Sequence, residues 1–444
     1  MNPTRTLAEF VATAHDLPPL AIDEAKRTLV NVLAISISAS EHISAKRVTQ
    51  WARDEGGAER ASILGSDLRT TPRIAAEVNG FLAHFQDYDD THFPTVLHPS
   101  APVWPAVLAA AEECGASGLD TLTAFALGEE AACRIAMSVH PWHYDQGWHI
   151  TGTVGGMGAA LGAGRIMGLD TDALVNAFGT AGTQAGGLRE VFGTDAKPMH
   201  AGKAAGNGYQ AAAFARLGLN AAPDILGGRR GFWAVASPNG HDASRITDNL
   251  GSHWELTQNG LKPYANGVVS HPIQDAVIQL RNEHSLTPEQ VERIEARVCQ
   301  LVPELMNRAE PRTGLEGKFS FQHCAAAALV DGAGHDTQFT DARVNDPVIA
   351  GIRARVSATV DPSLPEHEVY VTITLKDGRQ VSTHIEHASG SPANPLSDAV
   401  LDTKFRALVE PVYGAARAAQ LLDAARNLDG ASGVTELITL ARRA

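Results

Sequence analysis

The sequence predicts a mainly α-helical protein with a second, smaller α+β domain. Up to about residue 260, alanine is abundant and apolar residues recur at three- and four-residue spacing, which is typical of helices that bury one face. From about 260 to 393, segments appear in which apolar and polar residues alternate, as in strands. Helical spacing returns over 396–444. We therefore expect a large helical domain built from residues 1–260 and 394–444, with residues 261–393 inserted as an α+β domain.

Helices are expected in succession along the first part of the chain. The spacing of Ile22, Ala25 and Leu29 predicts an early helix, and similar spacing predicts others at 75–85, 103–113, 121–139 and 202–217. Glycine recurs between 152 and 164 without the GxGxxG pattern of a nucleotide-binding turn after a strand. The expected use of these glycines is close packing between helices.

Strands are expected only in the inserted part. In 293–302, Ile294, Ala296 and Val298 alternate with polar residues, as in a half-buried strand. Further strands are expected at 356–360, 367–375 and 379–385, the last two joined by a hairpin turn at Lys376-Asp377-Gly378, and helices at 272–283 and 319–330. Residues 389–395, rich in Ser, Gly and Pro, are the expected linker back to the helical domain.

Composition excludes several classes of function. Lys and Arg number 36 and Asp and Glu 50, so the net charge is −14, which argues against nucleic acid or an anionic membrane as the main partner. The four cysteines form no CxxC pair, which is typical of a reduced cytosolic protein. The apolar runs at 29–39 and 153–169 do not suit a membrane span, and the first residues lack a signal-peptide pattern. We expect a cytoplasmic protein.

Lysine is scarce, with eight in the chain, so each is more informative than usual. Lys197, His200 and Lys203 are spaced by three and would share one face of a helix. Such a face suits a substrate carboxylate, although a solvated basic patch is the alternative. Lys262, with His271 nine residues later, lies where the α+β domain begins, and ligand sites favour domain junctions.

Acidic and imidazole groups gather in two further segments. Asp87, Asp89 and Asp90 lie close together in sequence before His98; they could bind Mg²⁺, cap backbone NH groups or orient a catalytic histidine, and spacing alone leaves these open. Tyr144 and His149 precede the glycine-rich helix, whose N-terminus would favour an anion.

Taken together, these segments resemble the MmgE/PrpD family, which includes 2-methylcitrate dehydratase, cis-aconitate decarboxylase and iminodisuccinate epimerase. The resemblance covers nearly the whole chain in one order. The segments that carry it are 87–91 (DYDDT), 98–100 (HPS), 147–151 (GWHIT), 194–202 (TDAKPMHAG), 262–264 (KPY) with His271, 314–320 (GLEGKFS) and 394–397 (NPLS).

The resemblance implies a large helical domain covered by a smaller α+β lid, and a homodimer that needs neither a metal nor an organic cofactor. The family's active-site positions fall on Asp87, Thr91, His98, His149, Lys197 and Lys262. Two positions depart from the decarboxylase, since Gly267 stands where it has histidine and His323 where it has tyrosine. The spacer between Thr91 and His98 is also one residue longer.

Reactions of this family remove a proton alpha to a carboxylate, or CO₂, from small polycarboxylates. The negative charge that develops calls for preorganised cations, for which Lys197 and Lys262 are suited, while His98 and His149 would serve as base and acid. Asp87 would orient a neighbouring catalytic side chain or balance its charge. The expected substrate-binding residues are Thr91, Tyr144, Lys203, His200 and His323.

The first functional hypothesis is a dehydratase of a 2-methylcitrate-like tricarboxylate. An epimerase of an iminodisuccinate-like dicarboxylate is second, and a decarboxylase third because of Gly267 and His323. A non-catalytic carboxylate-binding protein and a metal-dependent enzyme using Asp87, Asp89 and Asp90 are the rivals from other classes.

Overall fold

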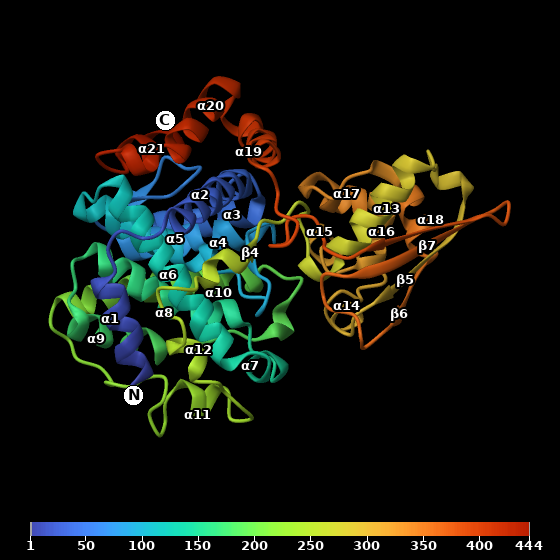
Figure 1. Ribbon diagram of the computed structural model, residues 1–444. Helices are drawn as coiled ribbons and strands as arrows, with labels where there is room; N and C mark the ends of the chain where they lie inside the picture. The colour runs from blue at the N-terminus through green and yellow to red at the C-terminus, as the bar shows by residue number, and fades with distance from the viewer. Residues whose placement is uncertain (1, 444) are drawn as a thin grey trace.

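The computed structural model describes residues 2–443 and shows a mainly helical protein with a smaller α+β part. In Figure 1 the N-terminal helices, blue to green, and the C-terminal helices, red, form one body. The yellow and orange segments form a second body beside it, here called the lid. Two connections join the bodies: one follows β4 (Asn259–Gly260), and the other precedes α19 (Asp398–Tyr413).

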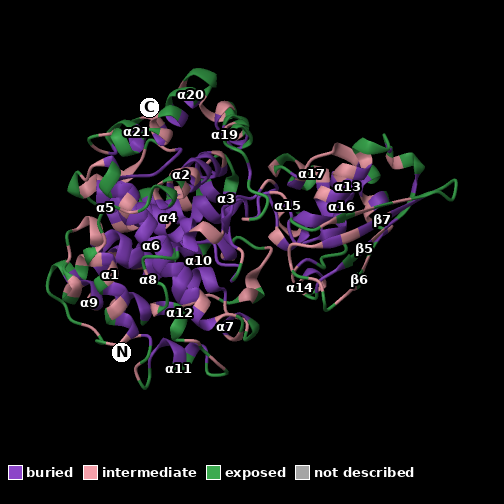
Figure 2. Ribbon diagram, in the orientation of Figure 1, coloured by how far each residue is buried: buried purple, intermediate pink, exposed green. Residues whose placement is uncertain are grey.

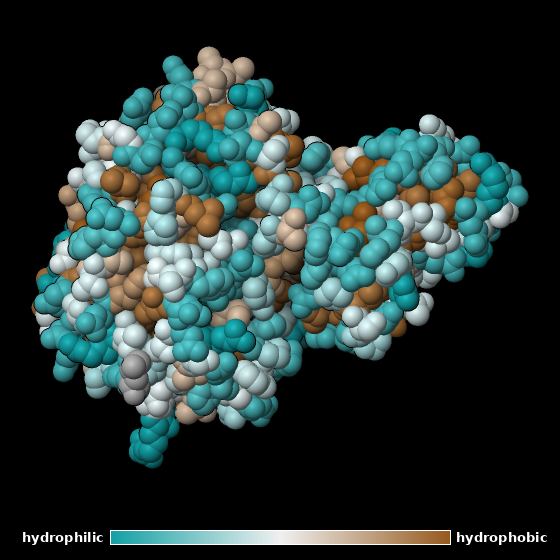
Figure 3. Space-filling model, in the orientation of Figure 1, coloured by the Kyte–Doolittle hydropathy of each residue, from teal (hydrophilic) through white to brown (hydrophobic). Residues whose placement is uncertain are grey.

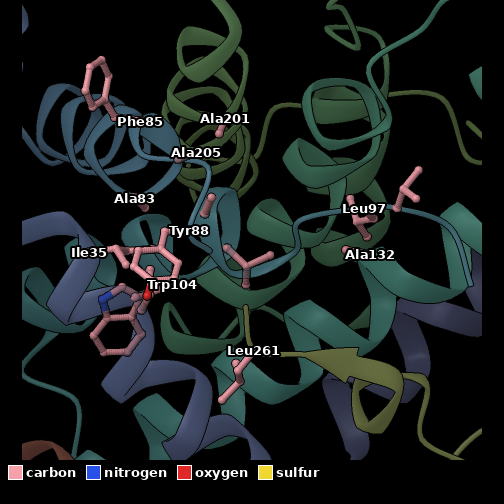
Figure 4. Close-up of a cluster of buried hydrophobic side chains, with 14 of the residues drawn as sticks. Ile35, Ala83, Phe85, Tyr88, Leu97, Trp104, Ala132, Ala201, Ala205 and Leu261 are labelled. Carbon is pink, nitrogen blue, oxygen red and sulfur yellow. The ribbon is translucent and has the colours of Figure 1, made fainter. Parts of the chain in front are cut away.

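Six long helices build the centre of the helical body, where buried residues concentrate (Figure 2). Helix α10 packs against both α4 and α8, and Figure 4 shows Ala201 and Ala205 of α10 near Ala83 and Phe85 of α4. The six are α2 (Pro19–Ala39), α4 (Pro72–Phe85), α5 (Ser100–Cys114), α6 (Gly118–Val139), α8 (Ile150–Ile166) and α10 (Ala196–Arg216).

The glycines of α8 allow this close packing, as predicted. A Cβ atom at Gly158 would lie 2.6 Å from the carbonyl oxygen of Gly128 on α6. On the other side of α8, a Cβ at Gly208 of α10 would lie 2.5 Å from the Cβ of Ala159. Since real side chains do not tolerate such distances, the bare backbone is what lets α6, α8 and α10 meet.

Shorter elements surround this centre. The C-terminal helix α19 packs on α2, which returns the end of the chain to the first helices. The remaining elements of this body are α1 (Pro3–Thr13), α3 (Ile43–Glu55), β1 (Ala61–Ser62), β2 (Arg69–Thr70), α7 (Trp142–Asp145), α9 (Thr171–Gly182), α11 (Phe232–Ala236), α12 (Ser244–Thr247), α20 (Ala415–Arg426) and α21 (Thr435–Ala441).

The lid contains a four-stranded sheet in the order β6-β5-β7-β8. Strand β5 (Val291–Val298) pairs in parallel with β6 (Val356–Val360) and antiparallel with β7 (Val369–Leu375), which pairs antiparallel with β8 (Gln380–Ile385). Helix α13 (His271–Glu283) packs on β7 and β8 and on α16 (Phe321–Asp331). The short helices are α14 (Leu301–Leu305), α15 (Gly314–Gly317), α17 (Asp341–Val344) and α18 (Pro347–Arg353).

A two-residue strand pair connects distant parts of the chain near the lid. Strand β3 (Thr91–His92) pairs antiparallel with β4, so that Thr91 lies opposite Gly260. This pairing sets the acidic segment after α4 beside the segment that leads to Lys262. Among residues 2–443, no helix has the length and apolarity needed to cross a membrane.

Candidate active site

Asp87 is the centre of a buried cluster of ions between the two bodies. Its Oδ1 lies 3.0 Å from the Nζ of Lys197 on α10 and 2.7 Å from the Nζ of Lys262, which follows β4. All three residues are at most 5% exposed. Burial alone would raise the pKa of Asp87, but the two ammonium groups hold that pKa well below its usual range. The cluster therefore carries one carboxylate against two ammonium groups.

The backbone at Asp87 is strained and is held in place by lysines. Asp87 has φ 52°, a left-handed conformation that is uncommon for residues other than glycine. Three consecutive carbonyl groups there accept hydrogen bonds from buried ammonium groups of three different segments. Lys318 of the lid donates to Gln86 O (2.7 Å), Lys262 to Asp87 O (3.0 Å) and Lys404 of α19 to Tyr88 O (3.1 Å). Lys404 also donates to the carbonyl of Lys262 (2.8 Å), so it ties together the two segments that meet at the ion pair.

His98 faces this cluster with a defined nitrogen. Its Nδ1 lies 2.9 Å from the carbonyl oxygen of Asp90 and 3.3 Å from Oγ1 of Thr91. Because a carbonyl oxygen only accepts, the proton of a neutral His98 resides on Nδ1. The basic nitrogen is then Nε2, which lies 4.0 Å from Oδ1 of Asp87. Burial lowers the pKa of His98 well below 6.5, which keeps the ring neutral.

A second histidine, His84 of α4, connects His98 to His149. Its Nδ1 lies 2.7 Å from Oδ2 of Asp89, and burial, which would raise the pKa of Asp89, is outweighed by His84 and His98, which lower it. The His84 ring lies edge-on to His98, with centroids 4.8 Å apart, and is stacked on His149 at 5.4 Å. Sequence reasoning missed His84 because a lone histidine inside a helix carries no spacing signal.

His149 stands at the start of α8 and contacts α10. Its Nδ1 lies 3.0 Å from Nδ1 of His200, and its backbone N–H donates to the carbonyl of Gly187. Burial, with smaller contributions from His84 and Lys197, lowers the pKa of His149 well below 6.5. The three residues predicted to share a face of α10 therefore separate: Lys197 contacts Asp87, His200 contacts His149, and Lys203 lines a second cavity with His200.

A cleft of about 810 Å³ lies between the two bodies and is lined by residues of both. Figure 3 shows hydrophobic residues in the furrow where the lid meets the helical body. Phe192 of the helical body and Phe319 of the lid both line the cleft, with ring centroids 5.8 Å apart. The Nζ of Lys197 lies 5.2 and 5.1 Å from these two centroids, so the rings cover the ammonium group on the side of the cleft. Arg189 and Arg308 line the same cleft. The sequence offered no signal for this aromatic pair.

Three predicted substrate-binding residues differ in their relation to the cluster. Thr91 touches His98 and belongs to it. Tyr144 is buried beneath the guanidinium of Arg189, which lies 4.0 Å from its ring centroid. His323 lies in α16, where its Nε2 is 2.9 Å from the carbonyl of Gln338 and its ring packs on Phe339. Both contacts lie within the lid, and neither gives direct support to a role for His323 in binding substrate.

The predicted trio of aspartates does not converge on one point. Asp87 is paired with lysines, whereas Asp90 accepts from Ser100 and Asn259, and burial raises its pKa to about 7. Among the described residues, the group with metal-ligand spacing is instead His84, Asp89 and His98, whose ligand atoms lie within 4.8 Å of one another. A divalent cation there would face the two ammonium groups bound to Asp87, and the like charges would repel it. The donors fit a metal in number, but their surroundings do not favour one.

Two models of a known protein family match this chain. The model of the MmgE/PrpD N-terminal domain matches residues 5–244, and that of the MmgE/PrpD C-terminal domain matches residues 264–430. The chain is 30% identical to the cis-aconitate decarboxylase of Mus musculus over 406 residues, which cover 87% of this chain and 82% of that protein. It is 28% identical to the Homo sapiens enzyme of that name, and the match covers 98% of this chain and 94% of that protein. It is 24% identical to the one from Aspergillus terreus, and that match covers 96% of this chain and 92% of the relative.

Proposed function

The chain belongs to the MmgE/PrpD family, and from that premise we propose that it is a cofactor-independent lyase acting on a small polycarboxylate. The observation that carries the proposal is the buried cluster in which Asp87 neutralises only one of two ammonium groups, those of Lys197 and Lys262. A substrate carboxylate would pair with the ammonium groups that share this single carboxylate, and buried charge of this kind attracts anions more strongly than a solvated lysine does.

The reaction begins with loss of a proton, or of CO₂, next to a carboxylate. Negative charge then moves onto that carboxylate, where Lys197 and Lys262 stabilise it without having to reorganise. His98 is the proposed base, because its Nε2 is unprotonated and faces the cluster. His149 is the proposed acid for the leaving hydroxyl, and Thr91, which contacts His98, is proposed to help bind the substrate. Lys203 lines the second cavity and is not given that role.

Dehydration of a 2-methylcitrate-like tricarboxylate is the first candidate reaction. A base and an acid flanking two cations are what removal of water requires. The surroundings of Gly267 also differ from a site built around histidine, since a Cβ there would lie 2.3 Å from the sulfur of Met306. An imidazole at this position would displace Met306.

Decarboxylation of cis-aconitate is the second candidate, and the curated relatives favour it, because each of those compared above is named for that activity. For either reaction we propose that substrate enters by the cleft between the bodies, and that movement of the lid separates Phe192 from Phe319. We also propose a homodimer, as the family resemblance implies, and a cytoplasmic location, as the cysteine pattern indicates.

Incubation in D₂O with 2-methylcitrate, citrate and cis-aconitate tests the proposal, with NMR following water loss, CO₂ loss and hydrogen exchange separately. The expected result is loss of water from 2-methylcitrate. Release of CO₂ from cis-aconitate would support the second candidate. Exchange at carbon with neither loss would indicate an epimerase, and binding without any chemistry would indicate a carboxylate-binding protein; either would contradict the proposed lyase.

Removal of metal ions should leave the activity unchanged. The two ammonium groups at Asp87 already supply the positive charge that a divalent cation would provide, and they oppose its binding at His84, Asp89 and His98. The measurement is turnover before and after exhaustive EDTA treatment followed by gel filtration. Activity that disappears and returns with Mg²⁺, Mn²⁺ or Zn²⁺ would overturn the metal-free proposal.

A further inference from the structure

The cluster has a second connection to the outside, separate from the substrate cleft. A cavity of about 340 Å³ is lined by parts of α8, α9 and α10 and by the segment 184–187, and it shares no lining residue with the cleft. His200 lines this cavity and is half-buried. On its inner side it contacts His149, which is 2% exposed. Two imidazole rings thus bridge the buried cluster and the second cavity.

The position of His200 is set by two glycines. A Cβ at Gly152 would lie 2.9 Å from the Cβ of His200, and a Cβ at Gly187 would lie 3.0 Å from its ring. Gly187 has φ 130°, which side-chain-bearing residues rarely adopt, and its carbonyl accepts from the backbone of His149. Gly187 therefore leaves room for the His200 ring, and its carbonyl group also holds the backbone of His149 in place.

The hydrogen bond between the rings constrains their protons. Nδ1 of His149 and Nδ1 of His200 are 3.0 Å apart, so one must donate and the other accept. The nitrogen of His149 that is left for substrate is Nε2, and the nitrogen of His200 that is left for the cavity is also Nε2. Each ring can take a proton on one nitrogen and release one from the other.

We propose that His200 is a proton-relay residue that links His149 to water in the second cavity. This rests on the proposed function, in which His149 is the acid. The proton on Nε2 of His149 passes to the leaving hydroxyl, which departs as water. His149 then takes the proton on Nδ1 of His200 at its own Nδ1, and His200 takes a proton from cavity water at Nε2.

The cycle closes by the reverse movement. The proton that His98 removed from substrate carbon reaches Nε2 of His149 through water once the product has left. The proton on Nδ1 of His149 then moves to Nδ1 of His200, and that on Nε2 of His200 leaves to the cavity. One proton enters and one leaves, and both rings regain their first tautomers. The first of these transfers, to the leaving hydroxyl, takes place while the lid is closed, and the second follows product release. His200 therefore acts through His149 and does not touch substrate.

Three variants of the full-length protein test the relay. His200→Phe should keep the slot filled but block proton movement, and should lower kcat by about tenfold or more with little change in KM. His200→Ala should lose activity too, and free imidazole should restore much of it, because the second cavity borders the space vacated by the ring. Asn207→Ala, which alters the cavity lining away from His149, is the matched control and should behave as the unaltered protein.

Rescue by imidazole separates a relay from a structural role. N-methylimidazole, which cannot carry a proton between its two nitrogens, should not restore His200→Ala, and neither compound should restore His200→Phe. Unchanged kcat in His200→Phe, or equal rescue of both variants by both compounds, would overturn the relay.

A measurement without turnover keeps the relay testable if the proposed lyase activity fails. With ¹⁵N-labelled histidine, NMR should show the ring N–H of His149 exchanging with water faster in the unaltered protein than in His200→Phe. In His200→Ala, imidazole should speed that exchange. Identical exchange in all forms would refute the relay, whereas slow exchange in His200→Phe together with no turnover of any polycarboxylate would refute only the proposed function.

Discussion

Replacing His98 or His149 with asparagine should lower kcat by about 10²- to 10⁴-fold, the usual contribution of a general acid or base. Asparagine retains hydrogen-bonding capacity but cannot take or release a proton at neutral pH. The affinity for a product analogue, measured by calorimetry, should change little, because Lys197 and Lys262 remain to bind its carboxylates. Near-normal turnover in both variants would show that the two histidines are structural.

The pH profile offers an independent check on the base. Burial lowers the pKa of both histidines well below 6.5, so each ring stays neutral, with one N–H, at pH values where a free histidine is already charged. The acid limb of kcat/KM, which reports the free enzyme, should therefore lie below pH 6.5. In His98→Asn that limb should disappear from the residual activity. An acid limb above pH 6.5 would contradict the assignment of His98 as the base.

Replacing Asp87 with alanine should destabilise the fold by about 3–5 kcal/mol, the range found when one partner of a buried ion pair is removed. Two ammonium groups, on Lys197 and Lys262, would then face each other without their carboxylate. Turnover should fall as well, because Lys197 and Lys262 would lose the carboxylate that holds their ammonium groups together, although Lys262 keeps its bond to the carbonyl of residue 87. Denaturant unfolding gives the free energy, and kcat is measured where the variant remains folded.

Matched variants separate charge from packing. Asp87→Asn keeps the shape but removes the charge, so it should lose most of the same stability. Asp172→Ala removes the carboxylate that contacts Arg5, but the two side chains are 77% and 54% exposed, and the loss should be below about 1 kcal/mol. Equal effects from Asp87→Ala and Asp172→Ala would show that burial of the ion cluster adds nothing to its contribution.

Local patterns in the sequence predicted most of the elements. The strand expected at 293–302 is β5, which ends earlier, at Val298, because helix α14 begins at Leu301; Ile294, Ala296 and Val298 lie on its buried face. The strand expected at 356–360 has those bounds. The helix expected at 202–217 begins six residues earlier, at Ala196. Its first turn carries Lys197, which is buried against Asp87 and not in an apolar core, so hydrophobic spacing could not reveal this turn.

Because periodicity and short motifs act over a few residues, the amino-acid sequence was enough to locate most helices and strands, the family resemblance and the ionisable candidates for the site. The pairing of Asp87 with two lysines, the contact of His84 with the other histidines and the position of His200 at a second cavity follow from the packing of the fold. The hydrogen bonds around Asp87 join residues 175, 232 and 316 positions apart, for Lys262, Lys318 and Lys404 respectively. Such contacts depend on how whole helices pack and on where the lid and the C-terminal helix return to the core. A local sequence pattern carries no information on such long-range contacts.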